Sequence, residues 1–379
     1  KRRGVRTVMF VETTMPELMF GMRHFDDPGE TLLTAPPAAR AAAERARMRA
    51  LVDAHVTKLR GPYVAAKPVY MEWREQEQRK RIPFEATLRN FRSTRSVSRL
   101  LAEARSAIQT PPSYTKRRSH PIDRPQRSWL EHRAYLRRSR AAIAAFQRRH
   151  DELARPVDLT KPFVFVALSF QPERTTSPDA GVFTDQRLMV EMLARAVPEG
   201  WQIYVKDHPV QFMREMYGEG SRDPAYYEHL AGLPNVTLVP RTTETFLLID
   251  HARAVATPTN TAGWEAVVRG KPVLIFGQPW YRGCPGVFYT PTIKACSEVM
   301  NQIEGGYEAN ESRMDEFLQA IADRGVHGYV EPSMGPVAGI SPQANVNPLC
   351  DVIVSLHQDV PHDAGAALKP GLRAEFEHE

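Results

Sequence analysis

The sequence has few of the residues and patterns that define several protein classes. Its 379 residues include only three cysteines, Cys284, Cys296 and Cys350. This odd, sparse set has no zinc-ligand spacing, which excludes a disulfide framework and a zinc site, so we expect a reducing, cytoplasmic setting. No run of about 18 apolar residues occurs, which excludes a membrane-spanning helix. We expect no secretory signal peptide, because none precedes the first predicted strand.

The charges are unevenly divided along the chain. Residues 1–155 hold 33 Lys and Arg against 16 Asp and Glu, a net charge of +17, whereas the remainder holds 17 against 28, a net charge of −11. Such a field can attract nucleic acid, an anionic membrane face or an acidic polymer. No recognisable nucleic-acid-binding module accompanies the charge, so we expect no nucleic-acid partner and interpret most of the arginines as solvated helix faces.

The length suits two domains. We expect residues 1–155 to be the partial N-terminal domain and residues 156–357 to be the C-terminal domain, followed by a disordered tail over 358–379. The N-terminal part begins with basic residues that resemble the tail of a crossover helix feeding a parallel strand over residues 7–11. We therefore expect this domain to be incomplete. Its Arg-rich helical segment is predicted to contain helices near 38–60, 91–108 and 126–153.

The C-terminal part alternates between short apolar runs and helical patterns. Apolar runs of this kind are typical of buried parallel strands, and they predict strands over 163–168, 203–205, 236–239, 254–256 and 273–276. The intervening helices are predicted over 184–196, 226–230, 243–249 and 261–269, and later ones near 293–303, 311–324 and 349–356. This alternation predicts an α/β fold, with right-handed crossovers and helices on both faces of a parallel sheet. Ligands of such sheets bind beyond the carboxyl ends of the strands.

One segment passes from a predicted strand end into a helix start, Thr257–Ala266. Thr259, Thr261 and Gly263 would let a ligand approach the first turn, where free N–H groups and the positive end of the helix dipole suit a phosphate. Glu265, one turn later, can accept hydrogen bonds from a ribose diol. Ordinary helix capping explains the same small polar residues without a ligand, and both interpretations stay open.

A second group, Lys206-Asp207-His208-Pro209, follows another predicted strand of the same sheet. His208, held by the following proline, can donate to a phosphate or protonate a leaving group, and Lys206 can supply a point charge. A lone histidine is more often structural. His208 differs because its strand and the strand before Thr257 belong to one sheet.

A third group surrounds the last predicted strand: Gly270-Lys271-Pro272-Val273 before it and Phe276–Gly283 after it. Without a ligand, these residues are a helix stop, a buried strand and a turn. The functional interpretation makes Trp280, Tyr281 and Arg282 the rim of a donor site.

In order, spacing and strand context, the three groups resemble the bacterial capsular-polysaccharide glycosyltransferases that transfer 3-deoxy-manno-octulosonate (Kdo) from CMP-Kdo. The resemblance covers about residues 163–285 and lies in Lys206-x-His208-Pro209, Thr259 or Thr261 with Gly263-x-Glu265-Ala266, Gly270–Val273, and Phe276-Gly277 with Pro279 and Tyr281. It implies the GT-B fold, in which two Rossmann-like domains face a cleft and the C-terminal one holds the nucleotide. The N-terminal one would be incomplete here and carry the helical insertion.

The resemblance also implies catalytic carboxylates. The residues Gln171-Pro172-Glu173, followed by Asp179 and Asp185, resemble the loop that carries the family's catalytic acid. Glu173 is our first choice for the nucleophile of a retaining transfer and Asp185 the second. Glu12 resembles the glutamate of the family's N-terminal loop and is our choice for the acid/base. Thr13-Thr14 and Gly283-Cys284-Pro285 depart from the family's usual Asp-Gly and Gly-Trp-Gly, and the second departure leaves the sugar open.

The resemblance further implies how a CMP-sugar donor, most readily CMP-Kdo, would bind. His208, Lys206 and the Thr259–Gly263 turn would hold the phosphate and Glu265 the ribose, with Lys271, Tyr281 and Arg282 also assigned to the donor. Arg282 or Arg241 would meet the carboxylate of the sugar. No Asp-x-Asp motif is present, so we expect neither a metal ion nor a further cofactor.

Alternatives remain for the donor, the activity and the setting. The donor could be a CMP-nonulosonate, a CDP-polyol or a UDP-hexose, and the acceptor is expected to be a glycan or glycolipid of a bacterial surface polysaccharide. A different class of function is a non-catalytic scaffold of a polymer-assembly complex. The Arg-rich segment would suit peripheral attachment to the anionic inner membrane, where each clustered basic residue contributes roughly 1 kcal/mol.

Overall fold

The computed structural model describes residues 8–22, 41–66 and 129–358, apart from 16, 174–175, 213–221 and 224. The chain divides into two compact units, residues 1–66 with 139–379 and residues 67–138. The features below belong to the first unit, except the first turns of helix α6 (Trp129–Leu153), which belong to the second. The predicted helix over 91–108 and all but the first residue of the predicted tail lie outside the described residues.

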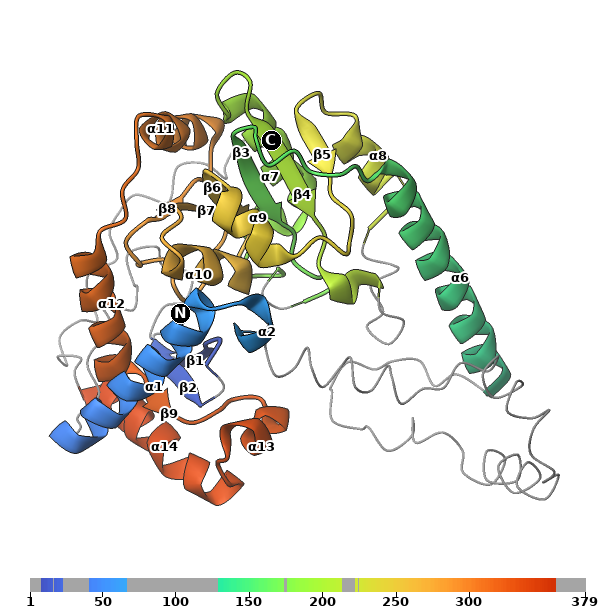
Figure 1. Cartoon of the computed structure of the whole chain (residues 1–379). Coiled ribbons are helices and arrows are strands. Elements are labelled where there is room, and N and C mark those ends of the chain that lie inside the picture. Colours follow the sequence, from blue (N-terminus) through green and yellow to red (C-terminus); the bar gives the residue numbers. More distant parts are fainter. Residues whose placement is uncertain are drawn as a thin grey trace, which may run out of the picture. The chain divides into compact units, whose positions relative to one another are not determined.

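The centre of the first unit is a six-stranded sheet with the order β5-β4-β3-β6-β7-β8 (Figure 1). All neighbouring strands in it run parallel. The strands are β3 (Phe163–Ala167), β4 (Gln202–Lys206), β5 (Val236–Leu238), β6 (Ala254–Thr257), β7 (Val273–Ile275) and β8 (Val287–Tyr289). The predicted α/β class with a parallel sheet is confirmed.

Helices cover both faces of this sheet because its central strands are apolar on both sides. Alternate residues of β3 enter two different cores, Phe163 and Phe165 on one face and Val164 and Val166 on the other. The second core contains α7 (Gln186–Ala196), α8 (Tyr226–Ala231) and α11 (Ile293–Glu304). The first contains α1 (Ala42–Arg60), α9 (Thr245–His251), α10 (Thr261–Val268) and α12 (Glu311–Arg324).

The N-terminal residues form a small antiparallel sheet with the order β1-β2-β9. Its strands are β1 (Met9–Glu12), β2 (Leu18–Met22) and β9 (Val326–His327). The expectation of a parallel strand is wrong, because β1 pairs with β2 and their five-residue connection permits only an antiparallel pair. The crossover helix expected before this strand lies outside the described residues. Pairing of β2 with β9 joins residues from the two ends of the chain.

Three further helices complete the described part, α2 (Tyr63–Ala66), α13 (Gly335–Ala338) and α14 (Pro342–Gln358). The last helix begins seven residues before the predicted start near 349, with Pro342 in its first turn, where a proline fits because the first N–H groups have no helical acceptor. Among the described residues, no helix combines the length and apolar character that a membrane crossing requires.

The strand order has a consequence for binding. In chain order β3 to β8 number one to six, so the sheet follows the doubly wound order 3-2-1-4-5-6. The direction of winding reverses between β3 and β6, and in such sheets a crevice opens there beyond the carboxyl ends of the strands. The loops after Ala167 and Thr257 meet at this reversal point.

Candidate functional site

Asn260 lies at the reversal point between β3 and β6, where its side chain joins the end of β3 to the start of α10. Its Nδ2 donates to the main-chain oxygen of Ala167, the last residue of β3, at 2.9 Å. Its Oδ1 accepts from the N–H of Ala262 at 3.0 Å and so caps α10. Of the two interpretations of this segment, capping is therefore present, and Asn260 is the capping residue. The same side chain also fixes where the helix start stands relative to β3.

The predicted phosphate-binding residues lie around this helix start. Thr259 is buried just before the cap, and Thr261 is the first helical residue and half-buried. The first N–H groups of a helix have no intrahelical acceptor, which makes the start of α10 a place where an anion can be bound. The structure thus brings Thr259 and Thr261 to the predicted edge of the sheet.

Gly263 and Tyr281 fit against each other. A Cβ on Gly263 would collide with Tyr281 Oη and lie 3.0 Å from Thr257 Cγ2. Tyr281 is fully buried, and its hydroxyl donates to the main-chain oxygen of Asn260 at 2.5 Å. The space that glycine leaves is thus occupied by Tyr281. In this structure both residues shape the helix start.

Glu265 and Lys206 place a buried carboxylate and a buried ammonium at the same edge. Lys206 ends β4, and its Nζ donates to Thr245 Oγ1 at 2.8 Å. Burial lowers the pKa of Lys206 to about 8, against the opposing charge of Glu265. Burial raises the pKa of Glu265 to about 7, against the opposing charge of Lys206. Among the described residues, no side chain or backbone group donates a hydrogen bond to the Glu265 carboxylate.

His208 is held in place by its neighbours after β4. Its N–H donates to Asp207 Oδ1 at 2.7 Å, and its Nδ1 accepts from the N–H of Val210 at 3.2 Å. In the neutral ring, Nε2 therefore carries the proton and can donate it. Asp207 is itself buried, and its Oδ2 accepts from Arg222 and from the hydroxyl of Tyr227. This network holds Asp207 and, through it, the backbone of His208 in place.

The loop after β3 is fixed by buried amides. Gln171 donates from its main-chain N–H to Gln211 Oε1 at 3.0 Å, which ties this loop to the one after β4. Ser169 exchanges two hydrogen bonds with the Gln186 side chain, at 2.8 and 3.0 Å. Glu173, the first choice for nucleophile, follows this anchored stretch and is exposed.

Asp185, the second choice for the nucleophile, lies at the start of α7. It caps α7 by accepting from the N–H of Arg187 at 3.2 Å. The Arg187 guanidinium also binds both carboxylate oxygens, at 2.9 and 2.8 Å, and holds the pKa of Asp185 below its usual range. A carboxylate engaged in this way is positioned to stabilise the helix.

The backbone of Asp179, in the same loop, lies next to Thr259. Its main-chain oxygen accepts from the N–H of Gln278 at 3.0 Å. A Cβ on Gly277 would lie 2.7 Å from that oxygen and 2.5 Å from Thr259 Cγ2, so the backbone around Asp179 lies directly beside Thr259. The glycine of Phe276-Gly277 was the available signal, since it is needed for this close approach.

Three further residues that were predicted to bind the donor, Arg282, Lys271 and Arg241, do not lie together. Arg282 is half-buried in the turn after β7, at the carboxyl edge. Lys271 precedes β7 and therefore lies at the opposite edge, with the length of α10 between it and the other residues. Arg241, the alternative partner for a sugar carboxylate, binds Asp151 through Nε and a terminal nitrogen, each at 2.9 Å.

Glu12 ends β1, outside the parallel sheet. Its Oε1 accepts from the N–H groups of Val330 and Glu331, at 3.1 and 2.7 Å. Its Oε2 makes no hydrogen bond with a described residue. No cluster of three or more His, Cys, Asp or Glu side chains suited to a metal ion occurs among the described residues.

Comparisons with known proteins place this geometry in a family. No curated protein matches the sequence. Similar solved structures include two KpsC domains of Thermosulfurimonas dismutans. The β-Kdo 2,4 transferase has 18% identity and a TM-score of 0.29, over 58% of this chain and 62% of that one. The β-Kdo 2,7 transferase has 15% identity and a TM-score of 0.27, over 54% and 59%. The calicheamicin glycosyltransferase CalG4 has 16% identity and a TM-score of 0.27, over 55% and 46%.

This chain thus covers about three-fifths of the two KpsC structures. A family model described as capsule polysaccharide biosynthesis protein matches residues 107–301, just over half of the 379 residues. The matched range contains β3 to β8 and therefore the reversal point between β3 and β6. The chain belongs to the capsule polysaccharide biosynthesis protein family.

Proposed function

We propose that this protein is a glycosyltransferase of bacterial surface-polysaccharide synthesis, with the GT-B arrangement of two domains around a cleft. It transfers Kdo or a related acidic sugar from a CMP-sugar to a glycan or glycolipid acceptor. The observation that carries the proposal is the Glu265 carboxylate, buried at the reversal point of the sheet beside Lys206 and without a hydrogen-bond donor from the described residues. A buried carboxylate in this state gains most from a ligand that donates to it.

A nucleoside monophosphate supplies the complementary groups. The ribose diol offers two hydroxyl donors to Glu265, and the phosphate offers negative charge to Lys206 and to the start of α10. His208 Nε2–H would donate to the phosphate oxygen as the bond to the sugar breaks. Charge on the departing CMP is then met by fixed donors, which is the main source of rate enhancement in such sites.

For the sugar, the proposed step is double displacement. A carboxylate attacks the anomeric carbon while the bond to the CMP oxygen breaks, and the acceptor hydroxyl, deprotonated by an acid/base, then displaces that carboxylate. Glu173 remains the first choice for nucleophile. Asp179 joins it because its backbone lies beside Thr259, whereas Asp185 already caps α7 and binds Arg187. Glu12 Oε2 is the proposed acid/base.

Transfer from CMP-Kdo to capsule-type or lipid-linked glycans tests the proposal, with CMP affinity measured on the same variants. We expect Glu173→Gln or Asp179→Asn to abolish transfer while leaving CMP affinity unchanged. Asp185→Asn, which keeps an oxygen for the helix cap, serves as the matched control and should retain turnover. A donor panel separates the alternatives: binding of UDP-sugars in place of CMP contradicts the proposed donor. Near-normal turnover in both the Glu173 and Asp179 variants contradicts the proposed nucleophiles.

The basic N-terminal part supports a proposal about location. Residues 1–155 carry a net charge of +17, and the acceptor class includes lipid-linked glycans. We expect the full chain to co-sediment with vesicles in proportion to their content of anionic lipid. Sedimentation that does not change with anionic lipid content contradicts peripheral attachment.

A further inference from the structure

His55 lies where three segments that are distant in the sequence meet. It belongs to α1, and its Nε2 accepts from the indole N–H of Trp264 on α10 at 3.3 Å. The same nitrogen lies 3.1 Å from Thr14 Oγ1, in the turn between β1 and β2. Trp264 immediately precedes Glu265, and Thr14 follows Glu12 by two residues. A single imidazole nitrogen therefore joins the helix that carries the proposed ribose ligand to the turn that follows the proposed acid/base.

The chemistry of the two partners fixes the state of the ring. An indole N–H can only donate, so Nε2 must keep its lone pair, and the ring proton is on Nδ1. The Thr14 hydroxyl can rotate, and it donates to the same lone pair. Burial lowers the pKa of His55 to about 4, and the charge of Lys58 acts in the same direction. The ring is therefore a neutral acceptor across the physiological pH range.

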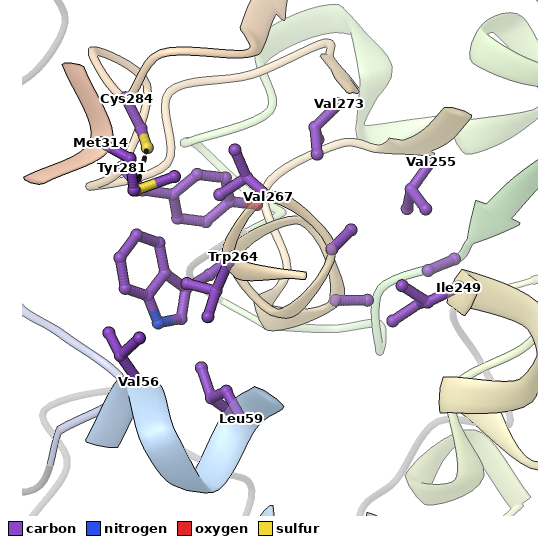
Figure 2. Packing of buried hydrophobic residues seen from close by; sticks show 14 of the residues in the cluster. Val56, Leu59, Ile249, Val255, Trp264, Val267, Val273, Tyr281, Cys284 and Met314 are labelled. Carbon is purple, nitrogen blue, oxygen red and sulfur yellow. Dashed lines mark hydrogen bonds between the residues drawn. The ribbon is translucent and has the colours of Figure 1, made fainter. Parts of the chain in front are cut away.

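Other contacts hold α1 on α10 independently of His55. Val52, Val56 and Leu59 are buried in the core that also contains Trp264 (Figure 2). Arg269, at the end of α10, donates to the main-chain oxygens of Leu59 and Gly61 at 2.6 and 2.9 Å. The hairpin packs in the same core through Met15, Leu18 and Phe20, and His55 adds a hydrogen bond to Thr14 at its turn. Loss of the imidazole should thus free Thr14 while leaving the apolar contacts of the helix pair and of the hairpin in place.

The turn matters because Glu12 precedes it directly. Thr13 Oγ1 accepts from the N–H of Met15 at 3.0 Å and donates to the main-chain oxygen of Leu18 at 2.8 Å, so Thr13 is held by both. The position of Thr13 bears directly on Glu12, which precedes it in the chain. The Glu12 carboxylate is held from its other side by the N–H groups of Val330 and Glu331.

We propose that His55 is a positioning residue, which holds the Thr13–Thr14 turn against Trp264 and so sets the place of Glu12 relative to the donor site on α10. The role rests on the proposed transfer reaction, in which Glu12 is the acid/base. Misplacing a catalytic group by about 1 Å can cost roughly a hundredfold in rate, so a contact that touches no substrate can govern turnover.

The test uses the full chain, five single substitutions and one double variant. His55→Leu removes both hydrogen bonds, Thr14→Val removes only the one to the hairpin, and Trp264→Phe removes only the one to α10. Thr57→Ala is the matched control, because Thr57 is exposed on the same helix and bonds only within it. The measurements are turnover with CMP-Kdo, CMP affinity, and amide hydrogen exchange over residues 9–22.

We expect His55→Leu and Thr14→Val to slow turnover by roughly ten- to a hundredfold with unchanged CMP affinity, and to speed exchange over residues 9–22. The His55→Leu/Thr14→Val double variant should be no worse than His55→Leu alone, because both remove the same contact. His55→Gln, whose side-chain oxygen can accept in place of Nε2, should recover part of the rate. Thr57→Ala should match the parent in all three measurements.

Three results would overturn the proposal. The first is parental turnover in His55→Leu and Thr14→Val, and the second is unchanged hydrogen exchange of the hairpin in both. If the parent protein itself transfers no sugar, the proposed function fails, but the exchange measurement still decides whether His55 holds the turn. A His55→Leu variant that loses CMP affinity as much as turnover would show a general structural role and would also contradict positioning.

Discussion

The side chain of Asn260 joins the end of β3 to the start of α10. Its Nδ2 donates to the main-chain oxygen of Ala167 at 2.9 Å, while its Oδ1 accepts from the N–H of Ala262 at 3.0 Å. Ala167 and Ala262 flank the point where the strand order reverses. One amide thus sets the distance between the two loops that border the proposed nucleotide site.

This relationship predicts different effects for two substitutions. Asn260→Ala removes both hydrogen bonds and should destabilise the protein by about 1–2 kcal/mol in urea unfolding, with weaker CMP binding. Asn260→Asp retains the cap but turns the donor into an acceptor that faces the Ala167 oxygen. It should bind CMP no better than Asn260→Ala, because the negative charge of the aspartate would also repel the phosphate. CMP binding by Asn260→Asp at the parental level would contradict the role of the bridge.

The Lys206 and Glu265 pair predicts how CMP affinity depends on pH. Burial raises the pKa of Glu265 to about 7, so below that pH its carboxyl holds a proton that ribose binding must displace. Burial lowers the pKa of Lys206 to about 8, so above that pH the phosphate loses a cation. Affinity should therefore rise with pH toward about 7 and fall above about 8.

Titration calorimetry over pH 5.5 to 9.5, as an approximate range around these two pKa values, checks this prediction. Glu265→Gln should lose the acidic limb near pH 7 and keep the alkaline limb, and Lys206→Met should do the reverse. An affinity that is flat between about pH 6 and 9 in the parent contradicts the assignment of both groups to the nucleotide.

We predict that the stability effects of substituting Gly263 and Tyr281 are coupled. Gly263→Ala places a Cβ against Tyr281 Oη and should cost about 1–3 kcal/mol of stability, as overpacking does. Tyr281→Phe removes the hydroxyl and its hydrogen bond to Asn260, which should cost about 1 kcal/mol. In the double variant the losses should be less than additive, since the Cβ no longer meets an oxygen. Additive losses in thermal unfolding would show that the two residues do not compete for the same space.

The buried Asp207 and Arg222 pair predicts a structural role next to His208. Asp207→Ala leaves the fully buried Arg222 guanidinium without its ionic partner and should cost about 3–5 kcal/mol. Combining it with Arg222→Met should recover much of that loss, because no unpaired charge remains. Urea unfolding measures both. A double variant that is as unstable as Asp207→Ala would indicate that the packing of this region, and not the charge, sets its stability.

The sequence predicted the parallel sheet because the strands carry their own signal. Runs such as Phe163–Ala167 are apolar on both faces, and helical patterns separate them. The same argument predicts the binding edge, since Lys206 and Thr257 end their strands. It missed β8 (Val287–Tyr289), whose residues are half-buried or, at Tyr289, exposed and show no such run.

Contacts between distant segments could not be predicted in this way. The antiparallel pairing of β1 depends on β2 and β9, and the His55 to Trp264 hydrogen bond spans 209 positions. The capping role of Asp185 depends on Arg187, two residues later, and was within reach of the sequence. Lys271 was placed by its motif, although a residue that precedes a strand lies at the opposite edge from residues that follow one.

In the proposed function, Glu265 binds the ribose of a CMP-sugar at the reversal point of the sheet. Calorimetric titration of CMP and UDP into the parent, Glu265→Ala and the exposed control Glu298→Ala tests it most directly. We predict that the parent binds CMP and not UDP. Glu265→Ala should bind CMP roughly ten- to a hundredfold more weakly, and Glu298→Ala should bind it as the parent does. Equal CMP affinity in the parent and Glu265→Ala would contradict it.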